Sequence, residues 1–296
     1  MRRVDGRSQV ACGNRGACRR SHVAYRELLL LVLLAWSPAF AANDGTWTIN
    51  HSGTLGAYTG IAGDAGSVSP YFWGSGYPTY VSIPSAVWFS GGDWSVEYWI
   101  YQDANGDQQT IYDFGNYGGS ASDDIAGAIY SGYQFSQEVY QGSTSGGVCY
   151  KNLSPAMSLH VWNHVVLTYV ASTTTWTLYV NGTPIGTHAE QAPLNVTRAV
   201  NYIGRVVAAW FGTGYFAYGS LAHFAVYDRA LGSTEIGTHY STGSTAGTGY
   251  KALIIAAAPL AYWRLAETSG TTAHDEMGAA PPSAVHRPRS RGWVGW

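Results

Sequence analysis

Hydrophobic and polar residues alternate with a period of two along several short stretches of the chain. The clearest case runs from Trp94 to Ile100, where Trp, Val, Tyr and Ile occupy every second position and therefore share one face of an extended segment. An Asn-Gly pair at 105–106, the strongest short signal for a hairpin, separates this strand from an expected return strand over Gln109–Phe114. A further strand is expected around Ala128–Tyr140.

The second half of the chain repeats this pattern of strands and turns. Trp162–Tyr169 is a strand rich in Val, and Trp176–Val180 leads directly into a second Asn-Gly pair, Asn181-Gly182. Apolar positions along Leu221–Val226 predict a last strand. Strands of this length with turns between them, and no long stretch with a helical period, predict an all-β fold of two packed antiparallel sheets.

The composition agrees with this fold and restricts the partners. Aromatic residues make up 14% of the chain and charged residues 11%, a balance that suits half-buried strands. Between positions 42 and 250, 13 acidic residues stand against four basic ones. An acidic body excludes nucleic acid and anionic membranes as main partners, because both are bound by clusters of Lys and Arg.

Two groups of residues resemble the laminin-G-like family. Leu221–Leu231 reads Leu-Ala-His-Phe-Ala-Val-Tyr-Asp-Arg-Ala-Leu and resembles the last strand and helical turn of that family, while 162–182 followed by Tyr202-Ile203-Gly204 resembles its middle. The resemblance covers about residues 43–242. It implies a jelly roll, a two-sheet antiparallel β-sandwich, of the concanavalin A-like lectin/glucanase superfamily. Ala222-His223 stands where relatives often carry acidic residues, so no function is transferred to those positions.

The resemblance also implies a function. We expect a non-catalytic recognition module, secreted or at the cell surface, that binds a carbohydrate or an extracellular protein, with calcium as a candidate ion. A structural spacer in an array of repeats is one alternative, and a glycan hydrolase is another. The glucanase branch of the superfamily carries Glu-x-Asp-x-x-Glu on one strand, and no Glu-x-Asp occurs in this chain, so we expect no enzyme activity.

The two ends of the chain depart from the pattern of the body. Residues 1–41 combine basic residues, a leucine-rich run and an Ala-x-Ala motif, which predicts a signal peptide and no stable membrane insertion of the mature domain; an out-of-frame leader is the alternative. We interpret residues 243–249 as a linker and residues 250–278 as the start of a second laminin-G-like repeat. Residues 279–296 turn abruptly Pro- and Arg-rich, as expected of a frameshifted tail.

One loop is the candidate carbohydrate site. Trp210, Phe211 and Tyr215 lie in a Gly-containing loop, 205–219, between two expected strands. Exposed aromatic faces stack on sugar rings, and loops at the rim of a sandwich commonly carry function. The alternative is that these rings cap the open end of the core.

One acidic pair is the candidate calcium site. Asp123 and Asp124 lie in a long loop rich in Gly and Ser, and carboxylate oxygens are the ligands that calcium prefers. A solvated loop without an ion is the alternative.

Overall fold

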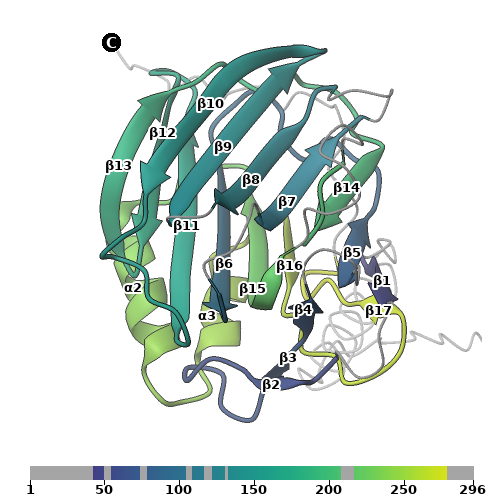
Figure 1. The fold of residues 1–296 in the computed structure, drawn as a ribbon, viewed down its shortest axis with the longest axis vertical. Coiled ribbons are helices and arrows are strands. Elements are labelled where there is room, and N and C mark those ends of the chain that lie inside the picture. Colours follow the sequence, from purple (N-terminus) through teal and green to yellow (C-terminus); the bar gives the residue numbers. More distant parts are fainter. Residues whose placement is uncertain are drawn as a thin grey trace, which may run out of the picture. The chain divides into compact units, whose positions relative to one another are not determined.

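Two antiparallel β-sheets pack face to face in the computed structural model (Figure 1). The structure describes residues 43–49, 55–73, 79–104, 109–116, 122–130, 133–207 and 217–278. Every strand pairing within these ranges is antiparallel. The predicted all-β sandwich is therefore confirmed.

The two main sheets have eight and seven strands. In spatial order the eight-stranded sheet consists of β10 (Thr144–Asn152), β9 (Gln134–Gln141), β8 (Ile125–Tyr130), β7 (Gln109–Gly115), β14 (Val200–Ile203), β5 (Thr79–Ile83), β1 (Gly45–Ile49) and β17 (Thr272–Ala273). The seven-stranded sheet consists of β13 (Thr183–Ala189), β12 (Thr175–Val180), β11 (Trp162–Val170), β6 (Trp94–Gln102), β15 (Tyr218–Tyr227) and β16 (Ala261–Trp263), with β4 (Tyr71–Trp73) paired to β15. The remaining elements are the small pair β2 (Tyr58–Thr59) and β3 (Val68–Ser69) and the helices α2 (Ser233–Ser244) and α3 (Tyr250–Ala256).

Local sequence signals set most of these elements. The turn between β12 and β13 has positive φ at both Asn181 and Gly182, as a two-residue hairpin requires. The first predicted Asn-Gly turn, at 105–106, lies outside the described residues. The strand expected around Ala128–Tyr140 is two strands, because β8 ends at Tyr130 and β9 begins at Gln134.

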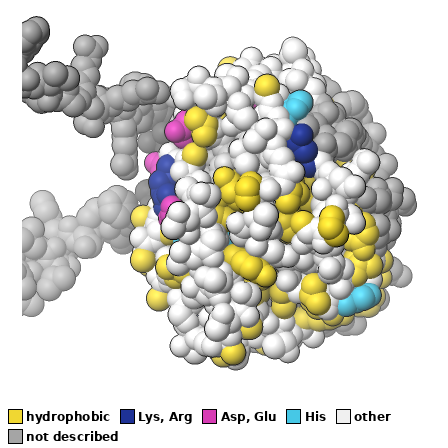
Figure 2. All heavy atoms as spheres, turned by 90° about the vertical axis from the view of Figure 1, so that its left-hand side faces the viewer, with side chains coloured by type: hydrophobic (Ala, Val, Ile, Leu, Met, Phe, Trp, Pro, Cys, Tyr) yellow, Lys and Arg dark blue, Asp and Glu magenta, His cyan; other side chains and the backbone are white. Residues whose placement is uncertain are grey.

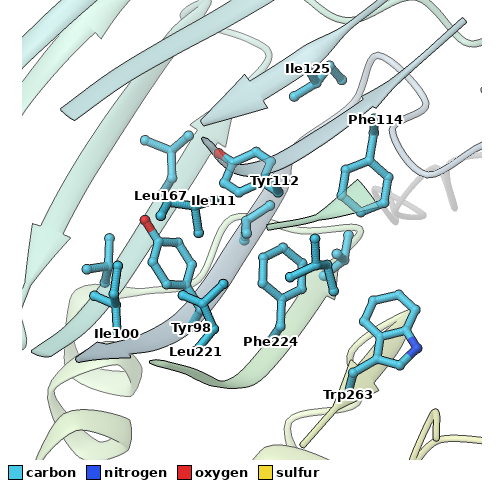
Figure 3. Close-up of a cluster of buried hydrophobic side chains, with 14 of the residues drawn as sticks. Tyr98, Ile100, Ile111, Tyr112, Phe114, Ile125, Leu167, Leu221, Phe224 and Trp263 are labelled. Atoms are coloured by element: carbon cyan, nitrogen blue, oxygen red, sulfur yellow. The ribbon is translucent and has the colours of Figure 1, made fainter. Parts of the chain in front are cut away.

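The core lies between the two sheets. The predicted apolar face of β6 points into it, and its four side chains from Trp94 to Ile100 are at most 2% exposed. Tyr98 stacks on Phe224 of β15 with ring centres 6.0 Å apart, and Phe224 faces Phe114 of β7 at 6.5 Å. Figure 3 shows these rings pointing toward one another from both sheets, so aromatic side chains join the two layers.

The opposite face of β6 is buried as well, because α2 and α3 pack over the outer side of the seven-stranded sheet. Its centre is the Glu97 carboxylate, which is fully buried. Tyr227 and Tyr250 donate their hydroxyl protons to it at 2.8 and 2.9 Å. His164 donates from Nε2 at 2.7 Å, and His239 lies with Nδ1 3.1 Å from each carboxylate oxygen. We call Glu97 and these four partners the Glu97 cluster.

The Glu97 cluster shifts the titration of its own members. Burial by itself raises the pKa of Glu97, but the hydrogen bonds from His164 and His239 outweigh it and hold that pKa well below its ordinary value. Burial alone would lower the pKa of His239, yet the hydrogen bond and charge of Glu97 raise it above its ordinary value. A charge-assisted contact therefore fastens α2 to the centre of the sheet.

Neither helix offers a route through a membrane. In the described part of the chain, the helices are too short and too polar to cross one. Their buried residues pack on the outer face of the seven-stranded sheet.

Residues 250–278 complete the same sandwich. β16 pairs with β15 and β17 pairs with β1, so the segment adds an edge strand to each sheet. Trp263 is fully buried, its ring centre lies 5.7 Å from that of Trp88, and its indole N–H donates to the Asn43 carbonyl at 2.9 Å. Asn43 in turn donates from its side chain to Asp275 at 3.1 Å. The strands and buried side chains of this segment thus belong to the same sandwich as the strands before it, and its interpretation as the start of a second repeat stays a prediction.

Replacing Trp263 by Ala should lower the free energy of unfolding of the whole sandwich by about 3–5 kcal/mol, because it empties a large core position. Urea unfolding followed by fluorescence measures the change. The control is His274→Ala, since that side chain is 65% exposed. A main transition that is unchanged in Trp263→Ala would mean that residues 250–278 fold apart from the sandwich.

Replacing Glu97 by Gln keeps the side-chain shape and removes its charge. Because the folded-state pKa lies below the ordinary 4.5, the carboxylate stabilises the fold above that pH and loses this contribution as the pH falls. We expect a loss of about 3 kcal/mol in Glu97→Gln near neutral pH. The difference from wild type should shrink by about 1.4 kcal/mol for each pH unit below 4.5. Urea unfolding at several pH values tests this, and a difference independent of pH would contradict it.

Candidate functional site

An aromatic surface occupies the part of the seven-stranded sheet that the helices leave open. Tyr101 follows Glu97 and Trp99 on the same face of β6, but it is only half-buried. Its neighbours in the sheet are Trp162 of β11 and Ser220 of β15, and Ser220 is in turn opposite Tyr71 of β4. Four strands thus present one row of side chains.

Six aromatic residues make up this surface, which we call the aromatic platform: Tyr58, Tyr71, Trp73, Tyr101, Trp162 and Tyr218.

Tyr71 is the centre of the platform. It stacks on Tyr58 at 5.0 Å between ring centres with an interplanar angle of 16°. Trp73 meets it edge to face at 4.8 Å, and Tyr218 does so at 5.9 Å. Tyr101 extends the cluster from Tyr58, 5.8 Å away. Ring contacts of this kind are favourable and hold each ring in a defined orientation.

The platform keeps aromatic area in contact with solvent. Trp73 is 41% exposed, and the neighbouring Val161 is 48% exposed. Tyr71 itself is only 5% exposed, whereas the other five residues of the platform are at least partly exposed. An aromatic binding site differs from a core cluster in this exposure, because exposed ring area can still be buried against a ligand.

Polar groups border the rings. Asp103 accepts a hydrogen bond from the Tyr58 hydroxyl at 3.3 Å, and the His160 ring nitrogen lies 3.6 Å from its other oxygen. His160 has a side chain that is 63% exposed. Burial, followed by the hydrogen bonds to Asp103 and Tyr218, raises the pKa of Tyr71, so its hydroxyl stays protonated. The border therefore supplies both donors and acceptors.

Sequence reasoning did not find this platform. Its rings come from five strands and from segments that lie more than 150 positions apart, so no local motif joins them. The available signal was the alternation along β6, which places Tyr101 on the face opposite to the core. Only the pairing of β4, β6, β11 and β15 brings the other rings beside it.

The predicted aromatic residues Trp210, Phe211 and Tyr215 lie outside the described residues. The base of their loop is described. Gly204 donates its N–H to the Ile111 carbonyl at 2.8 Å, and Ala217 donates to the Gly204 carbonyl at 3.1 Å. The role of the three aromatic residues stays a prediction.

The predicted calcium ligands are engaged within the protein. Asp123 accepts the Gly142 N–H at 2.7 Å and the Asn116 side-chain amide at 3.4 Å. Asp124 accepts the Ser122 N–H at 3.3 Å, and burial raises its pKa to about 7. These hydrogen bonds clamp two loops together, and calcium binding at Asp123 and Asp124 stays a prediction.

The described residues form no group of three or more His, Cys, Asp or Glu side chains arranged to hold a metal ion.

Comparison with known proteins places the chain by sequence. The family model described as the concanavalin A-like lectin/glucanases superfamily, Laminin_G_3, matches residues 75–237, more than half of the chain. No curated protein matches it in sequence.

Several solved structures are similar in fold. Tailspike protein 2 from an Escherichia coli O157:H7 bacteriophage has a TM-score of 0.53 at 10% identity, over 79% of this chain and 31% of that one. A SAP-like pentraxin from Limulus polyphemus has a TM-score of 0.42 at 14% identity, over 74% and 94%. A candidate carbohydrate-binding protein from Bacteroides ovatus has 0.47 at 19%, over 71% and 57%. At these identities the similarity concerns the fold alone, and this chain spans less than two thirds of the tailspike and the Bacteroides protein.

If Asp123 is a clamp, its loss should affect stability without any effect of calcium. Asp123→Ala should lower the free energy of unfolding by about 1 kcal/mol, because the partly buried Gly142 N–H loses its acceptor. Asp123→Asn is the matched control: it retains one acceptor and tolerates the positive φ of 57° at this position. Thermal unfolding with calcium and with chelator should coincide in all three proteins. A calcium-dependent rise in the wild-type Tm that Asp123→Asn lacks would restore the ion site.

Proposed function

The chain belongs to the concanavalin A-like lectin/glucanases superfamily, and from this premise we propose that it is an exported carbohydrate-binding module whose ligand stacks on the aromatic platform. The observation that carries the proposal is the set of ordered rings around Tyr71 with outward faces beside Asp103 and His160. The ligand is a saccharide.

The chemistry of the platform suits a sugar ring. A pyranose has faces of C–H groups and edges of hydroxyl groups. The exposed Trp73 indole and the Tyr218 and Tyr101 rings offer apolar area to the faces. Asp103 accepts hydrogen bonds from hydroxyl groups, and His160 donates or accepts them according to its tautomer.

The surface of the protein carries few charges. On the face shown in Figure 2, which is the β13 and α2 side of the molecule, charged side chains are few and hydrophobic ones lie among polar atoms. The body as a whole carries few charged residues. A partner that depended on clusters of charge would find little to bind.

Other functions lead to different outcomes. A protein partner could use the same rings as an anchor, since exposed aromatic residues are common at the centres of interfaces. A spacer repeat would show no saturable binding. A hydrolase would turn its glycan over, and the absence of Glu-x-Asp-x-x-Glu from the sequence argues against it. Export is proposed from the N-terminal signal pattern in residues 1–41.

Trp73→Ala should weaken binding of a neutral glycan by about tenfold or more, the equivalent of about 1.4 kcal/mol, because it removes the most exposed ring of the platform. A glycan array with the full chain identifies the ligand, and isothermal titration measures the affinity with calcium and with chelator. Trp210→Ala, measured in parallel, tests the predicted loop.

Leu194→Ala is the control, since Leu194 is 38% exposed and is not part of the platform. It should bind like the wild type. Binding that survives in Trp73→Ala and is lost in Trp210→Ala would move the site to the 205–219 loop. Absence of glycan binding by the wild type under both ionic conditions would overturn the proposal.

A further inference from the structure

An arginine lies between two tyrosine rings on the outer face of the eight-stranded sheet. The guanidinium carbon of Arg205 is 4.7 Å from the ring centre of Tyr80 and 4.7 Å from that of Tyr202. The two rings meet edge to face at 5.2 Å with an interplanar angle of 80°. We call these three residues the arginine cradle.

The backbone places the cradle. Ile203 points into the core, so Tyr202, its neighbour in β14, points outward by the period of two. Gly204 then turns the chain with φ of +85°, and a Cβ there would lie only 2.4 Å from the Phe72 ring. Glycine is needed at this position both for its φ and for its space. The turn brings Arg205 back over the tyrosines.

The charge of Arg205 is not neutralised within the described part of the chain. Arg229 pairs with Glu235, and Arg264 pairs with Asp64 and Glu276. By contrast, the contacts of Arg205 with described residues are the two tyrosine rings.

One carboxyl group lies beside Tyr202 on this face of the sheet. Asp113 of β7 is directly opposite Tyr202 in the sheet, and its Oδ2 accepts the Val207 N–H at 2.7 Å. Asp113 is only 1% exposed, and burial raises its pKa well above the usual range. Among the described residues, no carboxylate forms an ion pair with Arg205.

The geometry leaves the hydrogen-bonding edge of the guanidinium for a ligand. Stacking on rings uses the flat faces of the group, whereas its five N–H donors point outward in its plane. Two parallel N–H groups match the two oxygens of a planar carboxylate. Between positions 42 and 250 the chain has only four basic residues against 13 acidic ones, so few positions in this part of the chain could bind an anion.

The register of the sheet extends this site beyond one contact. Tyr202 is opposite Asp113, Asp113 is opposite Ala126 of β8, and Ala126 is opposite Glu138 of β9. These four residues form one row on the outer face of the sheet. Ala126 is a small residue between two acidic side chains, and it is partly exposed. Asp113 and Glu138 are themselves only 1% and 7% exposed, so Ala126 is the position of this row that a ligand held at Arg205 could reach.

We propose that the arginine cradle binds the carboxylate of an acidic saccharide, such as a uronic acid, with the sugar ring directed along the row toward Ala126. The saccharide class rests on the proposed function. The cradle itself lies on the opposite sheet from the aromatic platform, so the two sites succeed or fail separately.

The test is titration of the full chain with D-glucuronate, with D-glucose and acetate as neutral-sugar and bare-carboxylate probes, at low salt. Glucuronate should bind more tightly than either. Arg205→Gln should lose about tenfold or more of the glucuronate affinity, and Arg205→Lys should lose nearly as much, because lysine keeps the charge without the planar fork. Lys151→Gln removes a positive charge elsewhere and should bind within about twofold of wild type, since the effect depends on a local contact.

Ring proton shifts in the unmutated protein give a second readout that does not depend on a variant folding. Glucuronate should shift the resonances of Tyr80 and Tyr202 and leave those of Tyr101 and Trp73 unchanged. Equal affinity of wild type and Arg205→Gln, no glucuronate binding by wild type, or equal binding of acetate would each overturn the proposal. Neutral-glycan binding by Trp73→Ala tests the platform alone. Glucuronate binding that persists in Trp73→Ala supports the cradle, whether or not the platform binds a glycan.

Discussion

One buried carboxylate determines how the second layer of this sandwich is assembled. Glu97 lies at the centre of the seven-stranded sheet with four donors around it, from β11, β15, α2 and α3. A buried charge is tolerated only when it is paired and its oxygens are satisfied. Both helices must therefore stay against the sheet for Glu97 to remain ionised. Where the helices stop covering the sheet face, Tyr101 emerges, and the aromatic platform occupies what is left.

The alternation of β6 shows how far the sequence leads and where it stops. A period of two correctly predicts that Trp94, Val96, Tyr98 and Ile100 share the core face. It cannot predict whether the other face is exposed to solvent or buried, because the helices that bury it come from elsewhere in the chain. Glu97 reads as an isolated carboxylate in its strand, yet its partners lie 67, 130, 142 and 153 positions away. The local sequence determines which residues share a face of a strand. Burial of the second face depends on segments that are far away in the chain.

Residues 250–278 illustrate the same limit in a different way. Their resemblance to the start of a repeat is a local property of the sequence, and it does not reveal which sheets their strands join. The pairing of β16 with β15 and of β17 with β1 answers that question, because each edge offers unpaired backbone groups and an open core position. Asp123 is a similar case. Its residue type suits calcium, which stays a prediction, but no sequence pattern reveals that its Oδ1 accepts the Gly142 N–H.

The two proposed contacts use opposite faces of the sandwich and opposite kinds of chemistry. The platform is built on the sheet that carries the helices, and it offers ring faces with a polar border. The cradle is built on the other sheet, and it offers one cation whose position depends on Gly204 and β14, with no contribution from the Glu97 cluster.

A single short ligand cannot reach both sites, since the two outer faces point away from each other across the core. A long or branched glycan that carries acidic and neutral units could engage both, and linked weak contacts then bind more tightly than either contact alone. The acidic body opposes an acidic ligand over most of its surface, and Arg205 would provide a local cation that fixes where such a ligand binds.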